Sequence, residues 1–183
     1  MIVSVYLGSS PYCDRKYFDL AYQVGRMLAL KGHTLCYGGA GIGTMGFLAA
    51  GAKENGGKVI GVFPRGFQGT KEIREKGIPV RQEGLDQMIE VEDFAERKQV
   101  MEDMGDCAVV LPGSFGTLDE LFTYACNHAI EKNNKFIHIL NFDGYYDHLR
   151  EFVDTMEKEN FLKGTMIGVL IFHDSLDDLA AAL

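Results

Sequence analysis

The sequence predicts an α/β fold: a single-domain, Rossmann-like open sheet that is mostly parallel, with helices on both faces. Short apolar runs alternate from end to end with longer segments of helical periodicity, and glycine-rich turns follow several of these runs. The chain of 183 residues is 46% hydrophobic, enough for one core, and contains no linker, repeat or low-complexity segment. Because alternating strands and helices form parallel sheets covered on both sides, we expect one domain over residues 1–183.

Buried strands are expected where a few apolar residues stand between glycine, proline or polar residues. The runs that meet this description are rich in Val, Ile, Phe and Tyr. They span residues 2–7, 34–37, 59–63, 107–111, 136–140 and 168–172. Their short length favours strands over buried helices.

Longer segments with helical spacing separate the predicted strands. Asp14 is the expected N-cap of the first helix, and Gly32 is the glycine that ends it. Residues 64–85 fit neither pattern, because glycines and prolines stand among many charges, and we interpret them as a mobile loop or lid. Helices are expected over residues 17–30, 45–55, 93–104, 117–132, 145–160 and 175–182.

The charge balance excludes some classes of partner. Lys and Arg together number 18, and Asp and Glu number 26, which gives a formal net charge of -8. Proteins that bind nucleic acid or anionic membranes carry a basic face, so we expect neither partner here. Any bound anion must therefore be held by a local arrangement of groups.

Cysteine and histidine usage points to a reduced, metal-free protein. The cysteines at positions 13, 36, 107 and 126 form no CxxC pair, and three of them stand in apolar or helical surroundings that suit reduced, buried thiols. The five histidines show no metal-ligand spacing, so we predict no metal site. With no leader before the first strand and no apolar stretch long enough to span a membrane, we expect a cytoplasmic protein.

Three glycine-rich loops follow predicted strands, at residues 8–11, 38–46 and 112–117. All should open at the carboxyl edge of the sheet, where open parallel sheets bind ligands. Glycine lets the backbone approach a ligand, and a helix N-terminus adds about half a positive charge, so the loops together favour a phosphate. The Walker spacing is absent, and counted from Gly39 the dinucleotide pattern would need a glycine at position 44, where Thr44 stands, so we predict no cofactor.

The third loop runs into Thr117 and Glu120, whose spacing allows two interpretations. Thr at an N-cap with Glu three residues later is a capping box, in which both residues are structural. Alternatively, Glu120 serves a ligand, and a cation separates its carboxylate from the bound anion. Arg97 in the preceding predicted helix is the candidate cation. No Gly-x-Ser-x-Gly motif is present, which disfavours a covalent serine hydrolase.

Several segments together resemble one known family. Residues 112–120 read Pro-Gly-Ser-Phe-Gly-Thr-Leu-Asp-Glu and are similar to the PGGxGTxxE motif of the LOG-type phosphoribohydrolases. The other matches are Gly8-Ser9-Ser10 with the family's first loop, residues 38–46 with GGGxxGxMG, Arg97-Lys98 and Met101 with R-K-x-x-M, and residues 141–146 with N-x-x-G-Y-Y. The resemblance covers nearly the whole chain.

The resemblance implies an enzyme that hydrolyses the N-glycosidic bond of purine nucleoside 5'-monophosphates. The substrates would be AMP or N6-substituted AMP of the cytokinin riboside monophosphate type, and the products free base and ribose 5-phosphate. It implies that Glu120 lies beneath the ribose and stabilises an oxocarbenium-like transition state, while Arg97 keeps that carboxylate ionised and aimed. The implied substrate-binding residues are Gly8, Ser9, Gly39, Gly43, Lys98, Gly113, Ser114, Phe115, Gly116 and Thr117.

Two further expectations come with the family. Its members are usually homodimers, and the apolar face over residues 122–130 is a candidate for that contact as well as for the core. Members were often labelled lysine decarboxylases. That label is disfavoured here, because such chemistry normally uses a pyridoxal phosphate lysine and a far larger scaffold.

Three departures from the family pattern bear on the substrate. Ser114 replaces the second glycine of the PGG motif, and Phe94-Ala95 stands where Met-His is usual. Residues 126–129 replace a stretch associated with the base pocket. The phosphate end therefore matches the family while the base end differs. Two alternatives stay open: a nucleotide-binding or carrier protein of this fold without turnover, and, more distantly, a transferase that moves a deoxyribosyl group between bases.

Overall fold

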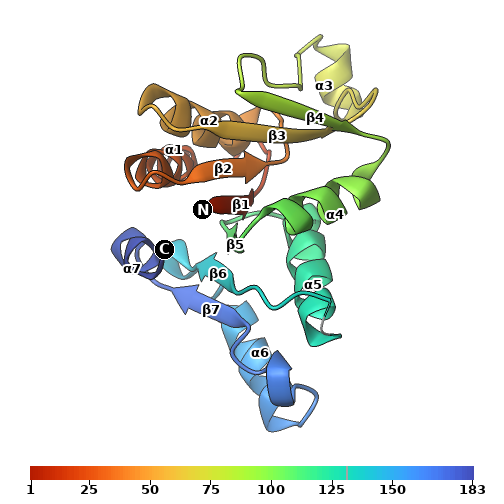
Figure 1. Cartoon of the computed structure of the whole chain (residues 1–183). Coiled ribbons are helices and arrows are strands. Elements are labelled where there is room, and N and C mark those ends of the chain that lie inside the picture. Colours follow the sequence, from red (N-terminus) through yellow and green to blue (C-terminus); the bar gives the residue numbers. More distant parts are fainter. Residues whose placement is uncertain (131) are drawn as a thin grey trace.

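In the described residues, 1–130 and 132–183 of the computed structural model, seven parallel strands form one sheet in the order β4-β3-β2-β1-β5-β6-β7 (Figure 1). From β1 the chain builds the sheet outward to β4, then returns to place β5 on the other side of β1. β1 and β5 therefore flank the switch point at which open α/β sheets bind ligands. The strands are β1 (Ile2–Tyr6), β2 (Thr34–Tyr37), β3 (Val59–Pro64), β4 (Gln87–Val91), β5 (Cys107–Val110), β6 (Ile137–Leu140) and β7 (Leu170–His173).

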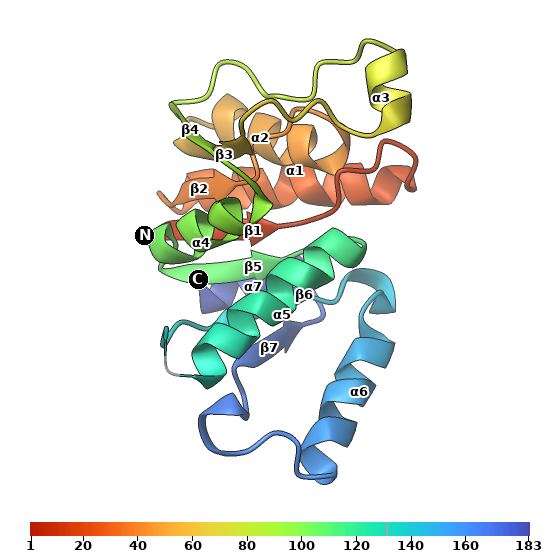
Figure 2. The same cartoon turned by 90° about the vertical axis from the view of Figure 1, so that its right-hand side faces the viewer.

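Side chains of the central strands alternate between two hydrophobic layers. In β1, Val3 and Val5 are buried in one layer and Tyr6 in the other. Helices cover both layers, as Figures 1 and 2 show from two sides. The first is covered by α1 (Arg15–Leu30), α2 (Gly43–Glu54) and α7 (Leu176–Ala182), the second by α4 (Phe94–Met104), α5 (Phe115–Ala129) and α6 (Asp147–Lys158). The predicted α/β sheet with helices on both faces is thus confirmed.

Helix ends follow local side-chain chemistry. The Asp14 carboxylate accepts a hydrogen bond from the backbone N–H of Lys16 at 2.9 Å, and Gly32 follows α1 with a φ of 73°, as the sequence predicts. The helix expected over residues 117–132 begins earlier, at Phe115, and ends at Ala129. Position 131 of that prediction lies outside the described residues. Two 3-10 turns, η1 (Phe142–Gly144) and η2 (Gly164–Met166), precede and follow α6.

Residues 64–85 contain more regular structure than the mobile loop or lid that the sequence predicts. They contain a short helix, α3 (Lys71–Glu75), and they bury Ile73 and Val80 in the first hydrophobic layer. Strand β4, which follows them, is absent from the sequence prediction. Its residues Gln87 and Glu90 are exposed because β4 lies at the edge of the sheet, so it lacks the continuous apolar run of a buried strand.

Two other expectations concern the chain as a whole. Within the described residues, no helix is both long enough and apolar enough to cross a membrane. All four cysteines are free, and Cys36 and Cys107 are buried as expected. Cys126 corrects the prediction of a buried thiol, because it lies on the exposed side of α5.

Candidate active site

A cavity of about 750 Å³ opens at the carboxyl edge of the sheet, where the three predicted glycine-rich loops lie. Residues from all three loops line it, together with the first turns of α4 and α5. Its remaining wall comes from residues 63–80, which include α3. Figure 2 shows α3 and the start of α5 on the same side of the sheet, beyond the ends of β1 and β5. The location is the one that the strand order favours for a ligand.

The third loop presents a helix N-terminus to this cavity. Because α5 begins at Phe115, Thr117 lies inside its first turn and is not the N-cap, which corrects one of the two interpretations of the sequence. The preceding Ser114 has φ -104° and ψ -155°, an extended backbone that any residue adopts, so serine fits where the family motif has glycine. Ser114 makes no side-chain cap hydrogen bond. The first N–H groups of α5 are therefore left for a ligand.

Gly113 brings the first and third loops into contact. A Cβ at this position would lie 2.1 Å from the Thr117 hydroxyl oxygen and 2.8 Å from the backbone nitrogen of Gly8. The Gly8 N–H donates to the carbonyl of Pro112 at 3.3 Å, and the Thr44 hydroxyl donates to the Gly8 carbonyl from the start of α2. The three loops are thus joined at the carboxyl end of β1.

Glu120 and Arg97 form an ion pair in the cavity wall, in which Nη2 of Arg97 donates to Oε1 of Glu120. Their side chains are 5% and 13% exposed, so the pair is nearly removed from solvent. A Cβ at Gly38 would lie 2.9 Å from Nη1 of Arg97, so glycine at the end of β2 leaves room for the guanidinium. Glu120 therefore faces a ligand site and does not fold back onto its own helix as a capping box.

The environment of Glu120 changes its protonation chemistry. Burial raises the pKa of its carboxyl to about 7, while the adjacent Arg97 guanidinium acts to lower it. The Nε of Arg97 is buried and has no hydrogen-bond partner among the described residues. A buried carboxylate held by one arginine, beside a cavity, is an arrangement suited to stabilising positive charge on a bound molecule.

Lys98, one residue after Arg97, also lines the cavity. Its Nζ lies 2.8 Å from the Asp119 carboxylate and 3.2 Å from the Thr123 hydroxyl, which ties α4 to the first turns of α5. Asp119 is largely exposed, so the pair is open to solvent.

Three predicted substrate-binding residues do not line the cavity. Gly39, with φ 71°, packs against Phe63, and Gly43, with φ 58°, lies so close to the Ser9 carbonyl that a Cβ would approach its oxygen to 2.3 Å. Both shape the second loop without reaching the ligand space. Phe115 is 89% exposed and its side chain does not line the cavity, although its backbone forms the first residue of α5. The other predicted residues all line the cavity. They are Gly8, Ser9, Arg97, Lys98, Gly113, Ser114, Gly116, Thr117 and Glu120.

The sequence singles out Phe94 of the cavity's aromatic wall as a departure from the family pattern, but not Phe63 or Phe67. Phe63, Phe67 and Phe94 all line the cavity, and the Phe67 and Phe94 rings meet edge to face with centroids 5.0 Å apart. Residues 126–129, which the family comparison associates with the base, lie at the far end of α5 and do not line the cavity. Asn127 instead donates to the buried Glu102 carboxylate at 2.6 Å.

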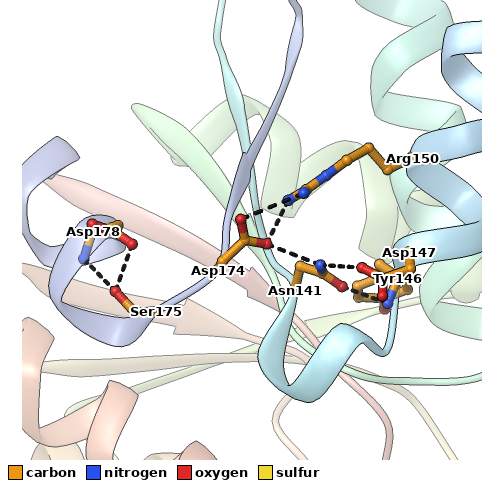
Figure 3. A network of polar contacts seen from close by, with 7 residues as sticks. All are labelled: Asn141, Tyr146, Asp147, Arg150, Asp174, Ser175 and Asp178. Atoms are coloured by element: carbon orange, nitrogen blue, oxygen red, sulfur yellow. Dashed lines mark hydrogen bonds and ion pairs between the residues drawn. The ribbon is translucent and has the colours of Figure 1, made fainter.

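A polar network beneath the third loop holds the turn that follows β6. Figure 3 shows Asn141 at its centre. The Asn141 amide donates to Asp147 at 2.7 Å and to Asp174 at 3.0 Å, and its side-chain oxygen accepts from the Tyr146 N–H at 2.7 Å. Arg150 pairs with Asp174 at 2.6 Å. The network therefore fixes the two tyrosines of the N-x-x-G-Y-Y segment.

Those tyrosines connect the network to the third loop. The Tyr145 hydroxyl donates to the carbonyl of Gly113 at 2.8 Å, and the Tyr146 hydroxyl donates to the carbonyl of Leu111 at 2.8 Å. Tyr145 also lines the cavity. The conformation of the third loop is thus supported from below by β6 and β7.

No group of three or more His, Cys, Asp or Glu side chains in the described part of the chain is arranged to hold a metal ion. The chemistry that the site can perform with its own residues rests on the N-terminus of α5, the Arg97–Glu120 pair and the aromatic wall.

Comparison with known proteins gives consistent family matches. A sequence model of the family described as "Possible lysine decarboxylase" matches residues 45–183. A cytokinin riboside 5'-monophosphate phosphoribohydrolase of Arabidopsis thaliana is 33% identical over 181 residues, covering 99% of this chain and 76% of the relative. Proteins of the same name from Rhodococcoides fascians and Mycobacterium tuberculosis are 33% and 32% identical over 180 residues, covering 98% of this chain and 87% and 91% of theirs.

Solved structures share the fold at lower identity. The molybdenum cofactor carrier protein from Chlamydomonas reinhardtii superimposes with a TM-score of 0.72 at 20% identity, over 99% of this chain and 94% of that chain. A molybdenum cofactor binding protein from Rippkaea orientalis gives 0.70 at 21% identity, over 99% and 93%. These likenesses establish the Rossmann-like fold alone.

Proposed function

The chain belongs to the family of the cytokinin riboside 5'-monophosphate phosphoribohydrolases, and on that premise we propose that it hydrolyses the N-glycosidic bond of purine nucleoside 5'-monophosphates. The substrates are AMP or N6-substituted AMP, and the products are the free base and ribose 5-phosphate. The observation that carries the proposal is the buried Arg97–Glu120 ion pair in the wall of a cavity that also receives the N-terminus of α5.

The first turn of α5 is the phosphate site in this proposal. Its N–H groups lack intrahelical acceptors, and the helix dipole adds partial positive charge at the same point. The Thr117 hydroxyl, packed against Gly113, supplies a further donor. This arrangement provides for an anion in a chain whose formal net charge is -8. Binding energy from the phosphate, which does not react, orients the sugar.

In this proposal Glu120 acts on the ribose. It lies five residues beyond Phe115, the first residue of α5, and at ~1.5 Å per residue this is about 7.5 Å along the helix axis. As the bond between C1' and the base nitrogen breaks, its electron pair leaves with the base, which takes up a proton. Positive charge develops on the ribose ring, and water adds to C1' with loss of a proton. The ionised Glu120 carboxylate lowers the energy of that cation, and Arg97 holds the carboxylate in place.

The test is to measure release of base from AMP and from N6-substituted AMP by the wild-type protein and two variants. Glu120→Gln removes the charge and Arg97→Ala removes its partner, and each should lower base release roughly 100- to 1000-fold, as for loss of one electrostatic contact to a transition state. Glu151→Gln, an exposed change on α6, is the matched control and should release base at the wild-type rate. Unchanged turnover in Glu120→Gln would remove the proposal.

The same assay separates the alternatives. A nucleotide-binding or carrier protein would gain thermal stability from AMP without releasing base. A transferase would exchange one base for another added to the mixture and give little net ribose 5-phosphate. The buried ion pair favours the hydrolase over the carrier, because simple retention of a nucleotide needs no desolvated carboxylate beside the sugar.

A homodimer belongs to the same proposal. Phe115 and Phe122 on α5, and Ile130 at its C-cap, are exposed apolar residues. At 100° per residue they share one side of the helix, together with the exposed Cys126. They are therefore not core residues. A second copy on this face would cover them and bring its own residues close to the start of α5 and the cavity.

A further inference from the structure

We propose that Phe67 and Phe94 form the subsite that binds the purine base. The inference rests on the proposed function, which assigns the phosphate to the start of α5 and the ribose to Glu120. It adds the residues that bind the base. Both side chains line the cavity, and both remain substantially exposed within it, at 37% and 45%.

The strand order sets the direction in which a nucleotide must extend. The phosphate site follows β5, and Phe67 follows β3, which lies three strand positions away in the sheet. At ~4.8 Å between neighbouring strands this is about 14 Å across the carboxyl edge. A nucleotide with its phosphate at the start of α5 and its ribose at Glu120 therefore extends its base toward the β3 side of the cavity.

The wall on that side is aromatic. Phe67 meets Phe94 edge to face, at 84° and 5.0 Å between centroids, and Phe63 lies 5.9 Å from Phe67 behind them. Two rings at nearly a right angle form a corner that can receive both the face and the edge of a flat heterocycle. Base–aromatic stacking accepts every base because each has a π face, so the corner favours an aromatic group without specifying its substituents.

Phe94 also joins the base corner to the reacting centre. Its ring lies 5.0 Å from the guanidinium carbon of Arg97, which in turn donates to Glu120. The base subsite is therefore adjacent to the ribose site, as one continuous substrate requires. Phe94 opens α4 just after the Asp93 N-cap, so its place is fixed by the same helix that carries Arg97.

The experiment compares AMP with ribose 5-phosphate, which lacks the base, by calorimetric titration in the Glu120→Gln protein so that AMP is not consumed. AMP should bind more tightly than ribose 5-phosphate. Adding Phe94→Ala should lower the affinity for AMP roughly 5- to 100-fold, the range for loss of one base–aromatic stack. The affinity for ribose 5-phosphate should stay within about twofold of its value without Phe94→Ala. Phe94→Leu should fall between, and Phe67→Ala should weaken AMP in the same selective way. Phe136→Ala, an exposed phenylalanine outside the cavity, is the control and should change neither.

Each other result overturns the inference. Equal affinity for AMP and ribose 5-phosphate would show that the base makes no contact, and unchanged AMP binding in Phe94→Ala would place it elsewhere. A parallel loss for both ligands would show that Phe94 acts only by holding Arg97. The outcome is separable from the proposed function: if the wild-type protein releases no base but Phe94→Ala selectively loses AMP, the subsite stands and hydrolysis falls. Melting curves of each variant establish that it is folded.

Discussion

At Glu120 two effects act on the same carboxyl in opposite directions. Burial removes water from the charged form and raises the pKa, whereas Arg97 favours the charged form, and the outcome is a pKa of about 7. The proposed chemistry needs the ionised form, because only a negative charge stabilises the ribosyl cation. An acid with a pKa this high is ionised only in part at neutral pH.

The consequence is a pH dependence of known sign. The value of kcat/KM for AMP should rise with pH through about 7, as the carboxyl loses its proton, and level off above it. A series of initial rates from pH 5.5 to 8.5 in one ionic strength measures it. A rate that falls as pH rises through 7 would mean that the protonated acid is the active form, and Glu120 would then have a different role.

Gly113 is a loop residue whose replacement should be poorly tolerated. A Cβ there would overlap Thr117 and approach Gly8, both at the joint of the first and third loops. Gly113→Ala should cost about 1–3 kcal/mol, as overpacking does, and lower Tm by roughly 2–10 °C for a domain of this size. Gly116→Ala, three residues on, has nothing within 4 Å of the added Cβ and should leave Tm unchanged or raise it slightly. Equal effects in thermal melts of the two variants would show that the contact around Gly113 is not tight.

Among the elements, α3 is joined to the rest of the cavity wall by a side-chain contact as well as by the packing of Ile73. The Tyr12 hydroxyl from the first loop donates to the Glu72 carboxylate, and Lys76 lies 2.6 Å from the same carboxylate. Both Tyr12 and Glu72 line the cavity. The other end of the segment is held by backbone contacts, with Gly41 N–H donating to the Val80 carbonyl at 2.7 Å.

Removing one hydroxyl should therefore loosen α3 locally. In Tyr12→Phe the amides of residues 71–76 should exchange with solvent roughly 2- to 10-fold faster, the effect of losing one net hydrogen bond. Hydrogen exchange with mass spectrometry measures it at peptide level. Tyr22→Phe is the matched control, since it loses a 2.7 Å hydrogen bond to Glu54 on the opposite face of the helix pair. Equal exchange of α3 in Tyr12→Phe and the wild type would show that the contact does not restrain the helix.

The elements also show what a single sequence can and cannot specify. Buried strands such as β5, with four apolar residues in a row, and helices with caps such as α1 were predictable because local pattern and tertiary burial agree. Strand β4 and helix α3 were not, because an edge strand and a five-residue helix take their structure from neighbours rather than from their own periodicity. The start of α5 was misplaced by two residues because Thr and Glu at capping-box spacing suggested a later N-cap.

For the site, the same distinction holds between chemistry and shape. The sequence could propose the charged residues Glu120 and Arg97 and the loop glycine Gly113, because their chemistry is specific. The aromatic corner could not, because Phe67 follows one strand and Phe94 opens a helix, and only the fold brings the rings within 5.0 Å. Residues 126–129, which the resemblance associates with the base, do not line this chain's cavity, since their position along α5 places them far from its first turn.

At the scale of the whole molecule, the exposed apolar side of α5 predicts association. The protein should have twice its 20.3 kDa chain mass in solution, measured by light scattering on a sizing column. Phe122→Glu should give a monomer, because a charge in the middle of an apolar contact is not compensated. Leu30→Glu changes an exposed leucine at the end of α1, on the other face of the sheet, and should leave the mass unchanged. A monomeric wild-type protein would contradict this expectation.

One measurement addresses the whole account: chromatographic analysis of AMP after incubation with the wild-type protein. The arrangement of Glu120, Arg97 and the α5 N-terminus requires adenine and ribose 5-phosphate to accumulate in equal amounts while AMP disappears. If AMP raises the Tm of the protein yet is recovered intact, the cavity is a nucleotide-binding site without hydrolysis, and the central claim is wrong.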